Sequence, residues 1–346
     1  MAPEPAPPEP VAPAPVATVL DHAPIQNKLF VALWLLVVAG GVAALVAALV
    51  PTGPAWLDGA GAVAVVTAYS WGLAARTGGR PVIFGVLTLV LGVAVLLLDQ
   101  DYLRTGAAVM TCVVSAVLAV MATTPAVQFV RAARECVVAV LIAAIGAMAT
   151  IGFDPVVSVV RFEYVTLGLA IAGAFAVVQR LGAGLHGLGR RGLVVVAIGG
   201  VLLAVTLLYA EMLRRYGSQD LVDNLLGGVR WSRDHLGAFP RPIETVLGVP
   251  ALAWGCHMRA RRRQGWWLCA FGVAATAPVA NALVNPAISL LECGLSVVYG
   301  LVVGLVIGYV IIRADLALTG SRGHGGRRLE EAGAVRPEPP RTAALL

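Results

Sequence analysis

The chain has 346 residues, of which 59% are hydrophobic and only 13% are charged. Soluble domains carry about 25% charged residues, so this composition leaves too little charge to cover a surface that faces water. The net charge of +6 would suit nucleic acid, but the basic residues cluster in short junctions between apolar runs, which is typical of a membrane protein. We therefore expect an all-α polytopic membrane protein with no nucleic-acid partner.

The two ends of the chain differ from the rest in composition. Residues 1–27 begin as a proline-rich run, and residues 314–346 are rich in glycine, arginine and glutamate. Such segments have little apolar surface to bury, so both are predicted to be disordered cytoplasmic tails. Residues 28–313 form the expected transmembrane domain.

Ten apolar runs fill the expected transmembrane domain. About 20 apolar residues cross the hydrocarbon core, and most of the runs approach that length. The second run is weak because it is rich in glycine and alanine, and the eighth because it is short. The runs predict a bundle of about ten transmembrane helices near residues 29–50, 57–75, 82–98, 106–124, 136–153, 163–179, 193–212, 244–258, 266–283 and 288–312.

The charges in the junctions between these runs alternate. Arginines fill the even-numbered junctions and Lys28 precedes the first run, whereas the short odd-numbered junctions carry acids. Positive charge marks the cytoplasmic side, so the pattern predicts an N-in/C-in topology. We expect a multi-pass protein of a bacterial plasma membrane, in contact with the lipid bilayer.

One outward junction is long and amphipathic. Residues 217–237 carry an apolar stripe with helical spacing and charges on the opposite face, with Ser218 as the expected N-cap. The segment is too polar to span, so it is predicted to lie on the outer surface as a helix. The stripe consists of Leu221, Val222, Leu225, Leu226 and Val229.

The motifs of the common enzyme classes are absent, and we do not expect an enzyme. No nucleophile elbow, zinc-protease motif, phosphate loop or dinucleotide fingerprint is present in a suitable context. The five cysteines are isolated within apolar runs and lack metal-ligand spacing, so neither a metal site nor another cofactor is expected.

Two groups of charges lie at opposite ends of the expected helices. The outward group could hold a cation or share a proton, but solvated loops with interfacial ion pairs are favoured. The other is a cytoplasmic arginine cluster followed by Trp266 and Trp267, which predicts a headgroup anchor, with specific lipid or protein recognition as the alternative. The outward group is Asp99, Asp101, Asp154, Arg161 and Glu163, and the anchor is Arg259, Arg261, Arg262 and Arg263.

The apolar stretch 266–312 is too long for one helix. Its 47 residues would form a rod of about 70 Å, so the chain must reverse, and Asn285-Pro286 is the expected turn and helix start. Glu292 would then lie some two turns inside the last span, where an ionisable residue usually faces a cavity. With Pro278, Asn281 and Ser289 it forms the candidate polar cavity; polar packing near the interface is the favoured alternative.

Three classes of function remain open. Two halves of five spans would have opposite orientation, which suits a secondary transporter or permease for a small solute or lipid-like molecule. The layout resembles that of ten-helix drug/metabolite exporters in span count and charge pattern alone, and the long outward junction departs from it. The alternative is a non-catalytic scaffold or assembly subunit in envelope biogenesis, with a membrane-protein partner. A membrane enzyme using the outward acids is the third class, and no substrate is encoded in any motif.

Overall fold

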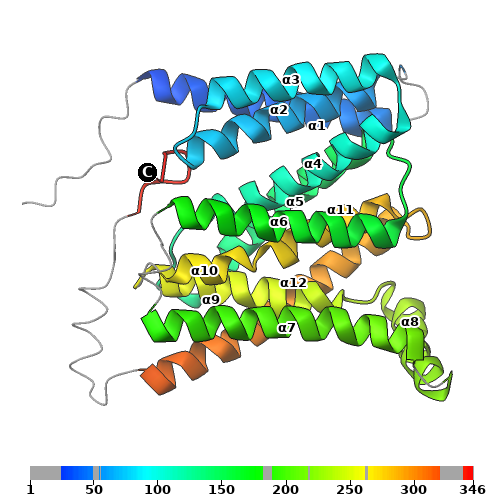
Figure 1. Cartoon of the computed structure of the whole chain (residues 1–346), viewed down its shortest axis with the longest axis vertical. Helices are drawn as coiled ribbons and strands as arrows, with labels where there is room; N and C mark the ends of the chain where they lie inside the picture. The colour runs from blue at the N-terminus through cyan, green and yellow to red at the C-terminus, as the bar shows by residue number, and fades with distance from the viewer. Residues whose placement is uncertain are drawn as a thin grey trace, which may run out of the picture.

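The computed structural model describes residues 25–49, 54, 56–181, 189–216, 219–261, 264–319 and 338–345. Within these ranges every regular element is a helix (Figure 1). Seven of the described helical segments are long and apolar enough to cross a membrane. The prediction of an all-α, multi-pass membrane protein is confirmed at this level, while the number of crossings and the topology stay predictions.

The first three helices form a layer at one edge of the molecule (Figure 1). The middle helix of this layer packs against both of its neighbours. The third helix buries only Gly85, Gly92 and Val95 and exposes aliphatic side chains over the rest of its surface, as expected of a helix that faces lipid. The bounds are Ile25–Ala48 for α1, Leu57–Arg76 for α2 and Pro81–Leu98 for α3.

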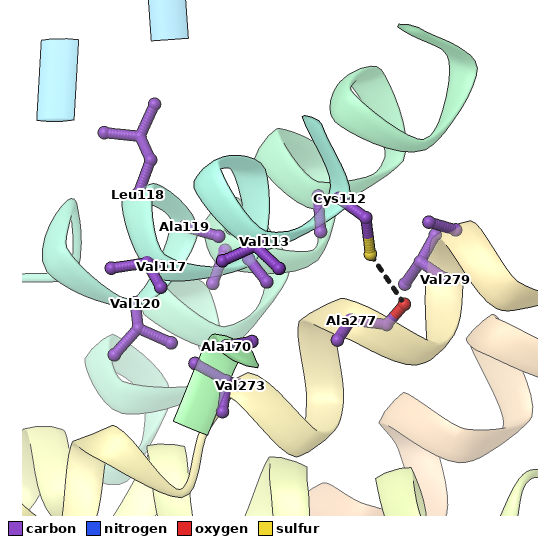
Figure 2. Close-up of a cluster of buried hydrophobic side chains, with 14 of the residues drawn as sticks. Cys112, Val113, Val117, Leu118, Ala119, Val120, Ala170, Val273, Ala277 and Val279 are labelled. Carbon is purple, nitrogen blue, oxygen red and sulfur yellow. Dashed lines mark hydrogen bonds between the residues drawn. The ribbon is translucent and has the colours of Figure 1, made fainter. Parts of the chain in front are cut away.

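The next three helices form the middle of the bundle together with α11 (Val273–Val284). Alanine and valine dominate their contacts, which lets the backbones approach closely. Figure 2 shows this packing, with the Cys112 thiol of α4 lying 3.7 Å from the Ala277 carbonyl oxygen of α11. The bounds are Asp101–Met121 for α4, Phe129–Ile151 for α5 and Val159–Arg180 for α6.

The remaining helices form the opposite edge of the molecule (Figure 1). The helix α8 lies at one end of the bundle (Figure 1). Its residues correspond to the predicted amphipathic segment 217–237. The expected N-cap of that segment, Ser218, lies outside the described residues. The bounds are Gly189–Tyr216 for α7, Gln219–Leu236 for α8, Glu244–Gly248 for the π-helix η2, Val249–Arg259 for α9 and Leu290–Thr319 for α12.

Two adjacent spans are interrupted. The predicted span 244–258 begins as η2 before it continues as α9, and the predicted span 266–283 divides into α10 (Gly265–Ala270) and α11. Glycines bring the two spans into backbone contact: a Cβ added at Gly248 would lie 2.2 Å from the backbone nitrogen of Ala275. Because both spans are irregular at their contact, they form the least regular part of the buried bundle.

The short junctions gather at two opposite ends of the bundle (Figure 1). At one end, Arg76 of α2 donates to the Met121 carbonyl of α4, and Arg259 of α9 donates to Thr123. We call this the arginine end. At the other, here the acidic end, Arg104 of α4 pairs with Asp154 after α5. The alternation of charge in the sequence therefore corresponds to a separation in space.

Each of the ten predicted spans overlaps a described helix. The turn between the last two spans differs from the prediction in where the last helix begins. Asn285 ends α11 in an extended conformation, as the residue before a proline does. The helix start predicted there is wrong, because α12 begins at Leu290 and its N-cap is Ser289, whose hydroxyl oxygen accepts from the Glu292 backbone N–H at 3.1 Å.

Two parts of the predicted C-terminal tail lie within the described residues. α12 continues beyond residue 313 to Thr319, and residues 338–345 are packed against the arginine end of the bundle. Residues 338–345 are therefore in contact with the bundle, and the disorder predicted for 314–346 stays a prediction. The predicted N-terminal tail lies mostly outside the described residues, which begin at 25.

Candidate functional site

A glutamate is buried where the chain enters the first interrupted span. Glu244 is the first residue of η2, and its side chain is fully buried. The Val249 N–H donates to the Glu244 carbonyl, five residues back, so the turn is wider than that of an α-helix. Such π-turns occur frequently at functional sites. Within the described part of the chain, neither carboxyl oxygen of Glu244 has a hydrogen-bonding partner.

The Glu244 carboxyl group lies against the backbone of α12. A Cβ added at Gly300 would lie 2.9 Å from the carboxyl carbon and 3.0 Å from one of its oxygens. Gly300 therefore provides the space that the carboxyl group fills. Burying a carboxyl group without a hydrogen bond costs free energy, and the cost is largest when the group is ionised.

The nearest basic side chain is bonded elsewhere. Arg241, in the turn before η2, interacts electrostatically with Glu244, but its guanidinium donates to the Pro278 carbonyl of α11 at 3.2 Å. Pro278 lies inside α11, and a proline has no N–H for the helix ladder. The carbonyl that the proline leaves without a helical donor is that of Ala274, four residues earlier, so the bond from Arg241 to the Pro278 carbonyl is an additional contact with α11. The same guanidinium lies beside the carboxyl group.

A second buried polar side chain lies one turn further along α11. Asn281 is buried, with its side-chain oxygen 3.2 Å from the Thr166 hydroxyl of α6. That hydroxyl has one proton and also lies 2.7 Å from the Phe162 carbonyl, which is the shorter contact. The Asn281 nitrogen has no partner within the described residues. One amide group of α11 is thus only partly satisfied.

Glu244 lies at the end of the eighth predicted span that is farther from the arginine end. The 15 residues from Glu244 to Arg259 at the arginine end would extend about 22 Å at 1.5 Å per residue. The hydrocarbon core is about 30 Å thick. The carboxyl group, the proline of α11 and Asn281 therefore form a polar set in the half of the bundle nearer the acidic end.

The predicted polar cavity is divided between two places. Pro278 and Asn281 belong to the polar set around Glu244. Ser289 is the N-cap of α12, and Glu292 lies in the first turn of that helix rather than two turns inside. Arg233 of α8 binds Glu292, with Nε 2.9 Å from the carboxylate oxygen. Glu292 thus connects α8 to the end of the bundle.

Two of the acids in the predicted outward group, Asp99 and Asp154, share one ion-pair partner. Arg104 pairs with both Asp99 and Asp154, so it connects the junction after α3 to the junction after α5. Asp101 and Arg161 are exposed and Glu163 is half-buried. None of these three forms an ion pair within the described ranges. The group therefore forms a surface ion-pair network in which two of the predicted acids take part.

One arginine of the predicted headgroup anchor, Arg259, is buried rather than exposed. Its guanidinium lies 3.4 Å above the Trp266 ring, with Nη1 2.8 Å from the Thr123 hydroxyl. Arg261 makes an interaction of its own, and residues 262–263 lie outside the described residues. Trp266 and Trp267 are also buried. Arg259 therefore belongs to a buried charged cluster rather than to a surface facing headgroups.

The sequence reasoning missed Glu244 because it stands at the edge of an apolar run. An acid in that position looks like an interfacial residue. The available signal was the shortness of the eighth run together with Gly248 and Pro250, because short spans interrupted by glycine or proline indicate a binding site in transporters.

Comparisons of the chain with models of known protein families, with characterised proteins and with solved structures gave no significant match. Among the described residues, no group of three or more histidine, cysteine, aspartate or glutamate side chains is arranged to hold a metal ion. The buried polar set around Glu244 is therefore the feature of the described residues that bears most directly on function.

Proposed function

We propose that this chain is a secondary transporter or permease of the bacterial plasma membrane and that Glu244 carries its coupling proton. The observation that carries the proposal is the full burial of this carboxyl group without a hydrogen bond in the described part of the chain. Ionisable residues within a membrane domain are costly and typically mark proton or ion pathways. The substrate is a small solute or a lipid-like molecule.

The interrupted helices support the same proposal. Transporters build their sites from discontinuous helices near the middle of the membrane, because the break frees polar backbone groups. Here the wide turn of η2 and the break between α10 and α11 are the two irregular places. Arg241 lies beside the acid of η2 and donates to the Pro278 carbonyl inside α11.

Arg241 gives the site two discrete arrangements. With Glu244 protonated, the guanidinium donates to the Pro278 carbonyl, as in this structure. When Glu244 loses its proton, the carboxylate competes for the same guanidinium, because a charged acceptor binds it more strongly than a neutral carbonyl. The Pro278 carbonyl of α11 then loses this additional donor. Protonation at η2 is in this way coupled to the conformation of α11.

The proposed orientation follows from the two ends of the bundle. Arginine-rich junctions face the cytoplasm in bacterial membrane proteins, which assigns the arginine end to the cytoplasm and α8 to the outer surface. Glu244 would then receive its proton from the outer side, which is the nearer one along η2 and α9.

The test uses sealed vesicles that contain the purified protein and carry an imposed pH gradient. A set of labelled organic anions, organic cations and amphiphiles is screened for accumulation that a protonophore abolishes. Glu244→Gln keeps the shape of the side chain but cannot release a proton. It should therefore lose gradient-driven accumulation while it still exchanges substrate down its own gradient. Glu292→Gln is the matched control, since it removes an acid in the surface ion pair with Arg233.

Two results would contradict the proposal. The first is equal accumulation by Glu244→Gln and the wild-type protein. The second is a wild-type protein that moves none of the screened compounds in either direction. The alternative function, a non-catalytic assembly subunit, predicts that Glu244→Gln still recovers the same membrane-protein partner and complements a deletion strain fully.

A further inference from the structure

The arginine end of the bundle holds a segment of the chain's own C-terminus. The Arg76 guanidinium donates to the Pro340 carbonyl at 2.8 Å and to the Ala343 carbonyl at 2.6 Å, and the Leu345 N–H donates back to the Arg76 carbonyl at 2.9 Å. The Leu345 side chain packs against the main core. Residues 338–345, here the C-terminal segment, are therefore bound through backbone groups as well as side chains.

Two charges of the C-terminal segment meet opposite charges that are buried in the bundle. Glu338 lies 2.5 Å from Nη2 of Arg259, and Arg341 lies 2.7 Å from a carboxylate oxygen of Glu135. The side chains of Arg259 and Glu135 are both fully buried. Removing Glu338 leaves Arg259 without its carboxylate partner, which is costly, because a buried charge that loses its counter-ion keeps its desolvation penalty. Removing Arg341 leaves Glu135 with Arg134 alone.

Each of the two charges also has partners within the bundle itself, apart from the C-terminal segment. Arg259 is oriented by two bonds to Thr123 and by the face of the Trp266 ring. Glu135 accepts from the Thr124 N–H at 2.8 Å and from the neighbouring Arg134. The Arg259 cation and the Glu135 anion, each held by other side chains of the bundle, form a site that is complementary to an acid and a base three residues apart, as Glu338 and Arg341 are.

We propose that the arginine end is a peptide-binding site for a Glu-Pro-Pro-Arg segment followed by a turn, in which the Ala343 N–H donates to the Pro340 carbonyl, and that residues 338–345 occupy it in cis. The two prolines restrict the backbone of the free segment, which lowers the entropy lost on docking. Residues 320–337 connect the C-terminal segment to α12, and a tether of this length gives an effective concentration in the millimolar range. This inference does not depend on transport.

The N-terminal sequence provides a natural comparison. Pro-Glu-Pro occurs at 337–339 and also at 3–5 and 8–10, but the residues three positions after Glu4 and Glu9 are Pro7 and Ala12. A peptide of residues 1–12 can therefore offer a carboxylate to Arg259 but no guanidinium to Glu135. If the site recognises both charges, it discriminates between the two ends of the chain.

The experiment measures binding of fluorescent peptides to purified protein in detergent by anisotropy. Protein truncated after residue 334 should bind the peptide 335–346, and its Glu338→Gln or Arg341→Gln version should bind about ten- to a hundredfold more weakly, as expected for one charge-assisted hydrogen bond. The peptide 1–12 should be weaker by a similar factor. Full-length protein should bind the peptide 335–346 at least about tenfold more weakly, because its own C-terminal segment competes.

A second form of the protein covers the case in which the truncated chain does not fold. A protease site placed within 320–337 allows the full-length protein to fold first and to be cut afterwards, and the labelled peptide then exchanges with the severed segment. Glu135→Gln protein should lose its preference for arginine at position 341 of the peptide while it keeps its preference for Glu338. Equal binding of the peptides 335–346 and 1–12 would overturn the proposal. So would a protease-cut protein that stays folded but does not bind the labelled peptide 335–346.

Discussion

The backbone contact between η2 and α11 gives the sharpest test of the fold. A Cβ added at Gly248 would lie 2.2 Å from the Ala275 nitrogen and 2.4 Å from the Ala274 carbonyl carbon. Non-bonded heavy atoms are separated by about 3.5 Å or more at favourable contact. Gly248→Ala therefore requires the two helices to separate by about 1 Å, because both clashing atoms belong to the backbone and have no rotamer to change.

The expected cost lies at the upper end of the range for overpacking. Inserting a methyl group into a packed core costs about 1–3 kcal/mol, and here no flexible side chain is available to absorb it. Gly248 has a helical φ of −62°, so the substitution adds no strain from the backbone conformation itself. We expect Gly248→Ala to lower the free energy of unfolding by about 3 kcal/mol.

The matched control is Gly168→Ala in α6. No atom lies within 4 Å of a Cβ added there. Alanine is favoured over glycine in a helix by about 1 kcal/mol, so this variant should be as stable as the wild-type protein or more stable. The assay compares the temperatures at which the two variants lose monodispersity in detergent, heated at one rate because such unfolding is irreversible. A Gly248→Ala midpoint equal to or above that of Gly168→Ala would refute the contact between η2 and α11.

Two further predictions concern the surface of the bundle. Glu292→Gln should change the free energy of unfolding by no more than about 1 kcal/mol, because its partner Arg233 is 51% exposed and exposed ion pairs contribute little; a loss of transport in this variant would return Glu292 to the functional site. The topology can be tested in the wild-type background, since all five cysteines are buried. In intact cells, an impermeant maleimide should label His235→Cys but not Arg131→Cys, and the opposite result would contradict the N-in/C-in topology.

The helices were predictable because membrane solvation acts on each segment separately. A run of about 20 apolar residues must span or be buried whatever its neighbours are, so each of the ten runs overlaps a described helix. The turn between the last two spans was also predictable, since a residue before proline resists helical geometry. The N-cap of α12 was not predictable, because Asn285 and Ser289 both suit that position. In the structure the Ser289 hydroxyl oxygen caps the helix by accepting from the Glu292 N–H.

The candidate site was less predictable because it depends on contacts between distant segments. Nothing near Glu244 in the sequence indicates that Gly300 makes room for its carboxyl group. Arg259 stands in a run of arginines that looks solvated, but Thr123 and Trp266 bury it. The C-terminal segment has a composition typical of disorder, and it packs through partners distant in the sequence: the opposite charges of Arg259 and Glu135 and the bonds with Arg76.

The proposed proton site and the peptide-binding site lie on one continuous element. Glu244 begins η2, and Arg259 ends α9, which follows η2 directly. The C-terminal segment holds the α9 end of this element, and η2 at the other end packs against α11 and α12, so a shift of α9 as a body would be transmitted to η2. If Glu244 is the proton carrier, removal of the C-terminal segment should alter how readily η2 moves against α11. Transport by the cut protein, with and without added peptide 335–346, would then show whether the two sites are coupled.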